Sequence, residues 1–571
     1  MHFSPRPNRA HEIAWMPWTQ EAFDRAKREE KPVLLSISAV WCHWCHVMDE
    51  TSYSSDAVIA AINERYVAVR VDNDRRPDVN ARYNQGGWPT TAFLTPDGTL
   101  IAGATYLPPD QMHQALTQIA EFYRTNRVDV EQRAGEIRSR TRTYEPAPAS
   151  DLTASMIDVV RERIGSAYDD EYAGFGDAPK FPMVEVLDFL LQEYRVTREQ
   201  RLYDMVAKSL LAMSGAGMYD HVEGGFFRYS TTRDWTVPHF EKMTEDHAGL
   251  LRVLATLVRT TRNDRFRQTL ISATGYIRAV LRDPQSSLFA GSQDADERYY
   301  SLPLDERRAM QPPYVDRTSY SNWTAAMAGT FVLAGYALED DRLIGEGEAA
   351  LDALHDRMRD DAGLLYHFIE PGGAPQVRGL LADQAAYLRA LVDAHEYTGV
   401  PRYLQRAREL VHAVREHFAA QDGGFYDHAA IEEQIAALEQ RDRPLPDNAL
   451  LAESLLRLHA IDPDGGYRTL AEDALRVYAH TYDRAGIFAA PFARALRRYL
   501  SPPAYVTITG SPENTEVLRE AAHALPDPLL VVHTKDGDGE APAAYFCRGT
   551  VCAAPAHTAP ELRDAFEALA V

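Results

Sequence analysis

The sequence has few cysteines, fewer basic than acidic residues and no long hydrophobic run. Four cysteines in 571 residues are too few for a disulfide-rich scaffold. No run of about 18 apolar residues occurs, so no transmembrane helix is expected. The net charge of −23 argues against nonspecific binding to nucleic acid or anionic membranes, because both require clustered Lys and Arg. The N-terminal residues lack the apolar segment of a secretion signal, so we expect a cytoplasmic protein.

The length of the chain indicates several domains, because one hydrophobic core does not grow to this size. Strand patterns occur at KPVLLSIS, YVAVRVDND, PTTAFLTPDG and TLIAGATYL, and the last two predict a hairpin across Pro96–Gly98. The segment HVMDETSYSSDAVIAAINER reads as helical, and a further helix is expected over 110–125. A β-α-β half followed by a β-β-α half predicts a thioredoxin-like fold for residues 1–130. Charged, then Pro- and Ala-rich residues predict a linker over 131–150.

Residues 151–500 read almost entirely as helix, and they contain an internal repeat. A Gly- or Asp-rich turn followed by a large apolar residue recurs at Phe175, Phe226, Phe289, Leu364, Phe425 and Ile487. The intervals accommodate two helices each, which favours an (α/α)6 toroid over an irregular helical bundle. Residues 501–571 return to strands and short helices and predict a small C-terminal α/β appendage. The fold class is therefore multidomain, α/β plus all-α.

A reactive thiol pair is expected at Cys42 and Cys45, directly after a strand and at the start of a helix. The free N–H groups and the dipole of a helix N-terminus favour thiolate over thiol. We therefore expect Cys42 to attack and Cys45 to resolve, with His43 tuning the thiolate. Pro89 begins a later strand, where thioredoxin-like domains place a cis-proline facing the disulfide.

Two other interpretations of the CxxC segment deserve comparison. Cys42-x-x-Cys45-His46 formally matches covalent haem attachment, but the flanking strand and helix do not suit it. Cys42, His43, Cys45 and His46 are zinc-type ligands, yet four ligands within five residues rarely close a tetrahedron. We expect no metal, and no cofactor beyond a redox-active Cys42–Cys45 disulfide.

The motifs VWCHWCHVM, GGWPTTAFLTPDG, GFGDAPKFP, DWTVPHFEKM and YFCRGTVCAAP resemble the DsbH-like family, which includes the spermatogenesis-associated thioredoxin-like proteins of animals. The resemblance covers nearly the whole chain. It implies a thioredoxin fold followed by a six-hairpin glycosidase-like toroid, similar to sugar epimerases. It does not imply a particular reaction.

If the repeat turns share one face of a toroid, their polar residues converge around a central cavity. The candidates are His221, Trp235, His239, Glu241, Lys242, Asp246, Asp294, Asp296, Asp383, Tyr387 and Asp447. Carboxylate pairs and histidines serve proton transfer in sugar-active enzymes, so His239 and Glu241, with Asp294 opposite, are the expected catalytic groups. The competing interpretation is structural, because Asp near a helix start is commonly an N-cap.

Three functions follow from these features. The first is a thiol-disulfide oxidoreductase acting on a protein partner or reductant, with a toroid that binds a ligand or partner. The second is a sugar epimerase or hydrolase with a regulatory thioredoxin unit, and the third is a non-catalytic scaffold. Cys547 and Cys552 are either secondary exchange thiols or unrelated small residues. The sequence does not identify the redox partner, the direction of electron flow, the cavity ligand or the oligomeric state.

Overall fold

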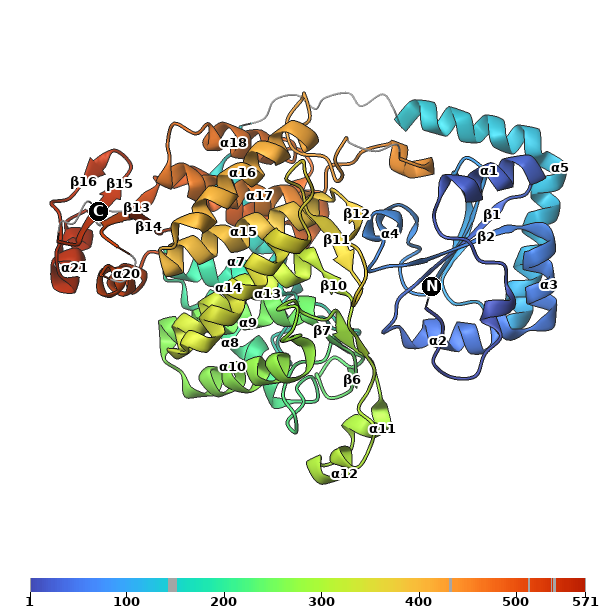
Figure 1. Cartoon of the computed structure of the whole chain (residues 1–571), viewed down its shortest axis with the longest axis horizontal. Helices are drawn as coiled ribbons and strands as arrows, with labels where there is room; N and C mark the ends of the chain where they lie inside the picture. The colour runs from blue at the N-terminus through green and yellow to red at the C-terminus, as the bar shows by residue number, and fades with distance from the viewer. Residues whose placement is uncertain are drawn as a thin grey trace. The chain divides into compact units, whose positions relative to one another are not determined.

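The computed structural model describes residues 2–141, 151–430, 434–511, 514–535, 537 and 541–569. The chain divides into two compact units (Figure 1). The thioredoxin-like unit comprises Met1–Pro146 and Ala430–Asp442, and the helical unit comprises Ala147–Ala429 and Arg443–Val571. No helix in the described ranges has the length and apolar character needed to span a bilayer.

A four-stranded sheet forms the centre of the thioredoxin-like unit. Its strands are β1 (Val33–Ser38), β2 (Val67–Asp72), β3 (Thr90–Leu94) and β4 (Leu100–Ala104), in the order β2-β1-β3-β4. β1 pairs parallel with β2 and antiparallel with β3, and β3 pairs antiparallel with β4. The predicted hairpin is present, with Gly98 N donating to Thr95 O at 2.9 Å and Gly98 at a φ of 84°. The thioredoxin-like strand order is confirmed.

Helices cover both faces of this sheet because β1 is apolar on both sides. The helices are α1 (Gln20–Glu29), α2 (His43–Glu50), α3 (Asp56–Arg65), α4 (Pro77–Tyr83) and α5 (Pro109–Thr141). Val33, Leu35 and Ile37 pack with α1 and α4, whereas Leu34 packs with α2, α3 and α5. The continuous helix expected after the cysteines is wrong, since Thr51–Ser55 interrupts it with a 3₁₀ turn, η2 (Ser52–Ser54).

Two boundaries of this unit differ from the sequence prediction. The expected linker over 131–150 begins as helix, because α5 continues to Thr141 past a kink at Asn126; residues 142–150 lie outside the described ranges. A distant segment also belongs here: the 3₁₀ helix η4 (Ala436–Glu439), drawn in orange in Figure 1, inserts Leu438 into the core beside α1 and α4. Ala437 N donates to Tyr83 Oη at 3.3 Å.

The helical unit is a closed toroid, as the repeat predicts. Its inner helices are α7 (Val184–Thr197), α9 (Thr244–Thr261), α13 (Ser321–Leu338), α15 (Leu381–Thr398), α17 (Leu445–Ile461) and α19 (Ala490–Leu500). Each contacts the next, and α19 returns to α7, so the ring closes within the described residues. The outer helices are α6 (Ala154–Ala167), α8 (Gln200–Gly215), α10 (Asp264–Tyr276), α14 (Asp341–Arg357), α16 (Pro401–Phe418) and α18 (Tyr467–Arg476).

Five of the six repeat turns share one backbone geometry. In each, the large apolar residue or its neighbour forms a β-bridge with the residue that begins the turn: Tyr168 with Phe175, Tyr219 with Phe226, Arg282 with Phe289, Arg359 with Leu365 and Ala419 with Phe425. The residue two positions before the bridged apolar residue has a positive φ each time: Ala173, Gly224, Ser287, Gly363 and Gly423. The turn around Ile487 differs, because it lies in the 3₁₀ helix η5 (Tyr482–Ala489).

The C-terminal appendage repeats the strand order of the thioredoxin-like unit. Its elements are β13 (Ala504–Thr509), α20 (Glu516–His523), β14 (Val531–Lys535), β15 (Ala543–Arg548), β16 (Val551–Cys552) and α21 (Ala559–Ala568). The sheet order is β14-β13-β15-β16, with β13 parallel to β14 and antiparallel to β15. No CxxC segment follows β13, so this copy of the topology lacks the thiol site of the first.

Candidate functional site

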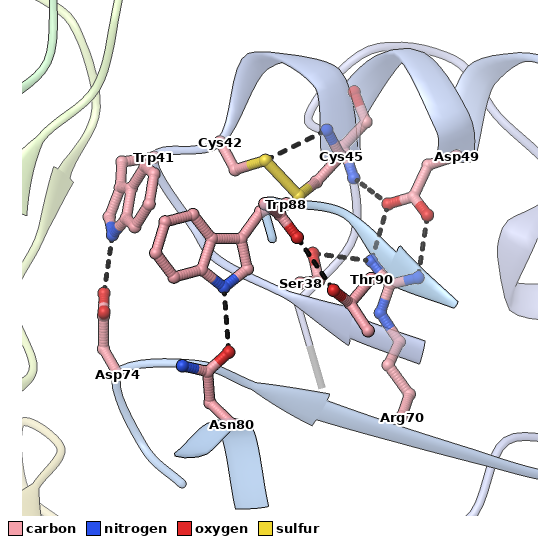
Figure 2. Close-up of a disulfide and its surroundings, with 12 residues drawn as sticks. Ser38, Trp41, Cys42, Cys45, Asp49, Arg70, Asp74, Asn80, Trp88 and Thr90 are labelled. Carbon is pink, nitrogen blue, oxygen red and sulfur yellow. Dashed lines mark hydrogen bonds and ion pairs between the residues drawn. A yellow bond between two sulfur atoms is a disulfide. The ribbon is translucent and has the colours of Figure 1, made fainter. Parts of the chain in front are cut away.

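Cys42 and Cys45 form a disulfide at the N-terminus of α2 (Figure 2). β1 is buried along its whole length and delivers the chain to Cys42, which is the N-cap of the helix. Cys45 N donates to Cys42 Sγ at 3.1 Å. Cys42 is 4% exposed and Cys45 2%. The side chain of Cys42 therefore occupies the position where helix N–H groups stabilise a sulfur anion.

Two tryptophans pack beside the disulfide and are each fixed by a hydrogen bond. Trp41 Nε1 donates to the buried Asp74 at 2.7 Å, and Trp88 Nε1 donates to Asn80 Oδ1 at 3.1 Å. The two rings meet edge to face with centroids 5.5 Å apart. The Trp88–Pro89 peptide bond is cis. Pro89 thus leads into β3 with its preceding residue beside the cysteines, as Figure 2 shows.

A buried ion pair lies beneath α2. Arg70 on β2 donates to both carboxylate oxygens of Asp49 at 2.8 and 2.9 Å, and both residues are almost fully buried (Figure 2). Ser4 N also donates to Asp49 at 3.0 Å. This pair fixes the second turn of α2 to the sheet. Sequence reasoning missed it, although an Asp in α2 and an Arg inside an apolar strand are both visible signals.

His46 follows Cys45 and is also buried. Burial, together with the nearby His2, lowers the pKa of its imidazole to about 4. The ring is therefore neutral at neutral pH and adds no positive charge beside the thiols. His43, the residue expected to tune the thiolate, is half-buried and lies edge to face with Trp44.

The surface next to the disulfide offers an aromatic contact. Trp44 is 51% exposed and tilts against Tyr106, with ring centroids 5.2 Å apart. An exposed aromatic residue beside a sulfur pair can bind an apolar part of a partner polypeptide while sulfur exchange proceeds.

Several side chains predicted to line the toroid cavity are buried in the core of the helical unit. Trp235 is 1% exposed, and its Nε1 donates to the carbonyls of Tyr172 and Ala173 at 3.0 and 3.2 Å. Lys242 is fully buried against Asp220 at 2.7 Å, and burial lowers the pKa of its ammonium to about 8. Tyr387 is likewise in the core.

Three further candidates have local roles or lie apart from the others. Asp296 caps the short helix α11 (Glu297–Tyr300) by accepting from Tyr299 N at 2.9 Å. Asp294 accepts from the next backbone N–H, that of Ala295, at 2.8 Å. His221 is exposed. The capping interpretation therefore describes Asp296.

The remaining candidates lie at or near the N-terminal ends of inner helices, and some are brought into histidine–carboxylate pairs. His239 Nδ1 hydrogen-bonds the buried Glu241, and its ring stacks on Tyr229. Asp383 in the first turn of α15 accepts from His367 Nδ1 at 3.0 and 3.1 Å, with both side chains buried. Asp246 lies in the first turn of α9.

Asp447 joins a cluster of carboxylates at the start of α17. Burial, with Asp383 and Asp427 nearby, raises the pKa of Asp447 to about 7. His428 Nδ1 lies 2.9 Å from Asp427 Oδ1. Sequence reasoning missed His367, His428 and Asp427. The signal was present, because both histidines follow repeat turns, three residues after Leu364 and Phe425.

Residues 6–142 match the family model Thioredox_DsbH, described as a protein of unknown function, DUF255. The resemblance to the DsbH-like family is confirmed. Spermatogenesis-associated protein 20 of Homo sapiens is 25% identical, with 96% of this chain and 89% of the human protein covered. The Rattus norvegicus protein of the same name is also 25% identical, with 94% and 84% covered.

Among solved structures, D-mannose isomerase matches 62% of this chain and 99% of its own, with a TM-score of 0.50 at 11% identity. Cellobiose 2-epimerase from Bacillus thermoamylovorans B4167 matches 61% and 100%, with a TM-score of 0.48 at 14% identity. The likeness to D-mannose isomerase shows a shared fold and does not assign its activity to this chain.

The remaining cysteines, Cys547 and Cys552, are bonded to each other across β15 and β16. Cys547 is buried and Cys552 is exposed at the sheet edge. In the described part of the chain, no three His, Cys, Asp or Glu side chains are grouped as metal ligands.

Proposed function

We propose that this protein is a thiol-disulfide oxidoreductase that uses Cys42 as the attacking thiol and Cys45 as the resolving thiol. The position of Cys42 Sγ at the N-cap of α2, where it accepts the N–H of Cys45, carries this proposal. On reduction the same N–H and the helix dipole stabilise the Cys42 thiolate, which lowers the pKa of the thiol below its ordinary value near 8.5.

The exchange proceeds in two balanced steps. The Cys42 thiolate attacks one sulfur of a partner disulfide, forming a mixed disulfide and releasing the other partner sulfur as a thiolate. The Cys45 thiolate then attacks Cys42 Sγ, which restores the Cys42–Cys45 disulfide and releases the partner as a dithiol. The reverse sequence oxidises a partner dithiol. The exposed Trp44, directly before Cys45, supports a polypeptide partner, because an exposed ring can pack against an apolar side chain of that partner.

The test is reduction of insulin disulfides, driven by dithiothreitol and followed by turbidity. Wild-type protein should accelerate the reaction, and Cys42→Ser should abolish the acceleration. Cys45→Ser, reduced beforehand and mixed with insulin after dithiothreitol has been removed, should accumulate a mixed disulfide that is visible by mass, because no resolving thiol is present. The double variant Cys547→Ser, Cys552→Ser is the matched control and should retain activity. Equal rates for wild type and Cys42→Ser would contradict the proposal.

A second activity, proton transfer on a sugar-like carbonyl substrate, is favoured by the histidine–carboxylate pairs of the toroid. His239 with Glu241 and His367 with Asp383 have the arrangement in which a carboxylate orients an imidazole base. Asp447, whose pKa is near 7, is suited to exchange a proton at neutral pH. The fold shared with D-mannose isomerase makes aldose and ketose sugars the first substrates to try.

This activity predicts exchange of the proton next to the sugar carbonyl with solvent deuterium. Mannose, glucose and fructose are incubated with the protein in D₂O and examined by NMR. Wild type should incorporate deuterium and His239→Gln should not, whereas His221→Gln, at an exposed position, should behave as wild type. No incorporation by wild type into any of the three sugars would remove this second activity and leave the thiol chemistry untouched.

A further inference from the structure

A charged cavity of about 130 Å³ lies at the end of the toroid opposite the histidine–carboxylate pairs. It is lined by the middle and C-terminal parts of inner helices and by the Ala522–Leu530 part of the appendage. A water molecule needs only about 10–15 Å³ of such space, so the cavity accommodates something larger. Most of its lining residues are polar, and none of them is used in the proposals above.

Positive side chains outnumber negative ones in this cavity. Among the described residues, seven arginines and five carboxylates line it. Every carboxylate is already engaged in an ion pair. Asp393 pairs with Arg252 and Arg457 at 2.6 and 2.7 Å, and Asp188 pairs with Arg494 and Arg389 at 2.7 and 3.0 Å.

The other carboxylates are engaged in the same way. Glu453 pairs with Arg494 at 2.9 Å, and Glu396 with Arg457 at 2.9 Å. Asp527 pairs with Arg548, which lies outside the cavity lining, at 2.9 Å. The protein therefore has no carboxylate left in this cavity to neutralise the remaining cations.

Three arginines in the cavity make no ion pair with a carboxylate in the described ranges. Arg195, Arg259 and Arg498 each lie two residues before the end of their helix, on α7, α9 and α19. These helices are neighbours in the ring, so the three guanidinium groups approach the cavity from adjacent positions. Arg259 donates to Tyr397 Oη and to the His523 carbonyl at 2.6 Å each, and Arg498 donates to the Leu529 carbonyl at 2.7 Å.

Unused hydrogen-bond donors also remain in the cavity wall. Arg494 is 2% exposed, and its Nη2 has no hydrogen-bond partner among the residues that the structure describes. The same is true of Arg498 Nε. Burial lowers the pKa of Arg195 to about 10, with Arg259 adding repulsion. The dipole at a helix C-terminus favours a cation, but it does not provide a hydrogen-bond acceptor for a buried guanidinium N–H. The site is thus built for a ligand that brings negative charge and several acceptor oxygens.

We infer that this cavity binds a phosphate-class oxyanion, either inorganic phosphate or the phosphoryl group of a small metabolite, between Arg195, Arg259, Arg498 and the free edge of Arg494. Guanidinium groups match phosphate oxygens in charge and in planar donor geometry. A tetrahedral anion presents oxygens in several directions at once, which suits donors that approach from three helices.

The experiment is isothermal titration of the full-length protein with inorganic phosphate, with ionic strength held constant by sodium chloride. Wild type should bind one phosphate per chain with a Kd below about 1 mM. Arg195→Gln and Arg498→Gln should each weaken binding about tenfold or more. Arg163→Gln, on the exposed face of α6, is the matched control and should change the Kd less than about twofold.

Thermal unfolding distinguishes a lost ligand site from a damaged fold. Without phosphate, Arg195→Gln should be at least as stable as wild type, because it removes an unpaired cation. Phosphate should raise the midpoint of wild type and not that of Arg195→Gln. Glycerol 3-phosphate binding as tightly as phosphate assigns a phosphomonoester, and binding of phosphate alone assigns the free anion. No saturable phosphate binding, an equal response in Arg195→Gln, or binding of succinate in place of phosphate would overturn the inference.

Discussion

At the level of single residues, the properties of the thiol site depend on the charges around it as well as on the cysteines. The neutral, buried His46 and the neutralised Asp49–Arg70 pair place no net charge under α2. The N-terminus of α2 therefore provides a field that favours the thiolate form of Cys42.

His46 makes the stability of the thioredoxin-like unit dependent on pH. Its pKa is about 4 in the folded protein against an ordinary value of 6.5, so only the unfolded chain binds a proton between these values. Stability from this group is complete above pH 6.5 and is lost as the pH falls toward 4, by up to about 3 kcal/mol. His46→Gln should flatten this part of the profile measured by urea unfolding. Exposed His113→Gln is the control and should leave the profile unchanged.

At the scale of elements, the toroid depends on five equivalent turns whose residue at positive φ reverses the chain. In several of these turns, the Asp directly after the residue that begins the turn accepts backbone N–H groups within it. Asp220 accepts from Val222 N at 3.0 Å, and Asp283 accepts from Gln285 N at 3.0 Å. This local bonding is the physical basis of the Gly- and Asp-rich repeat in the sequence.

Gly224 tests the turn geometry. Its φ is 83°, and a Cβ there would lie 2.7 Å from the Ser272 carbonyl oxygen. Gly224→Ala should therefore destabilise the helical unit by about 1–3 kcal/mol, seen as a lower midpoint in far-ultraviolet circular dichroism. Gly215→Ala, at the end of α8 with open space around the new Cβ, should be neutral or slightly stabilising. Similar midpoints for the two variants would show that the turn tolerates a side chain.

At the scale of the whole molecule, the thioredoxin-like unit is assembled from two parts of the chain far apart in sequence. The segment that contains η4 comes between α16 and α17, yet it contributes Leu438 to the core under α1 and α4. Gly98 permits this approach, since a Cβ there would lie 2.1 Å from the Ala436 Cβ.

Leu438→Ala should lower the free energy of unfolding of this unit by about 2–4 kcal/mol, because Leu438 is 1% exposed. Tryptophan fluorescence is the suitable probe, since five of the seven tryptophans, at positions 15, 18, 41, 44 and 88, belong to this unit. Leu388→Ala, in the core of α15, should leave the fluorescence transition in place. An unchanged fluorescence transition in Leu438→Ala would show that the segment containing η4 is not part of this core.

Features that depend on neighbours along the chain can be predicted from the residues alone. Strand, CxxC and helix follow one another within a few residues, and the repeat turns are closed by their own Asp and Gly. Composition and spacing therefore suffice to predict the thioredoxin-like fold, the thiol pair and the toroid. Which distant side chains meet depends instead on the folded chain. It paired His367 with Asp383, placed Trp235 and Lys242 in the core, brought Leu438 into the first unit and gathered Arg195, Arg259 and Arg498 at one cavity. A charged residue reads the same in the sequence whether it is buried or exposed. Its role depends on the partners that the fold brings next to it.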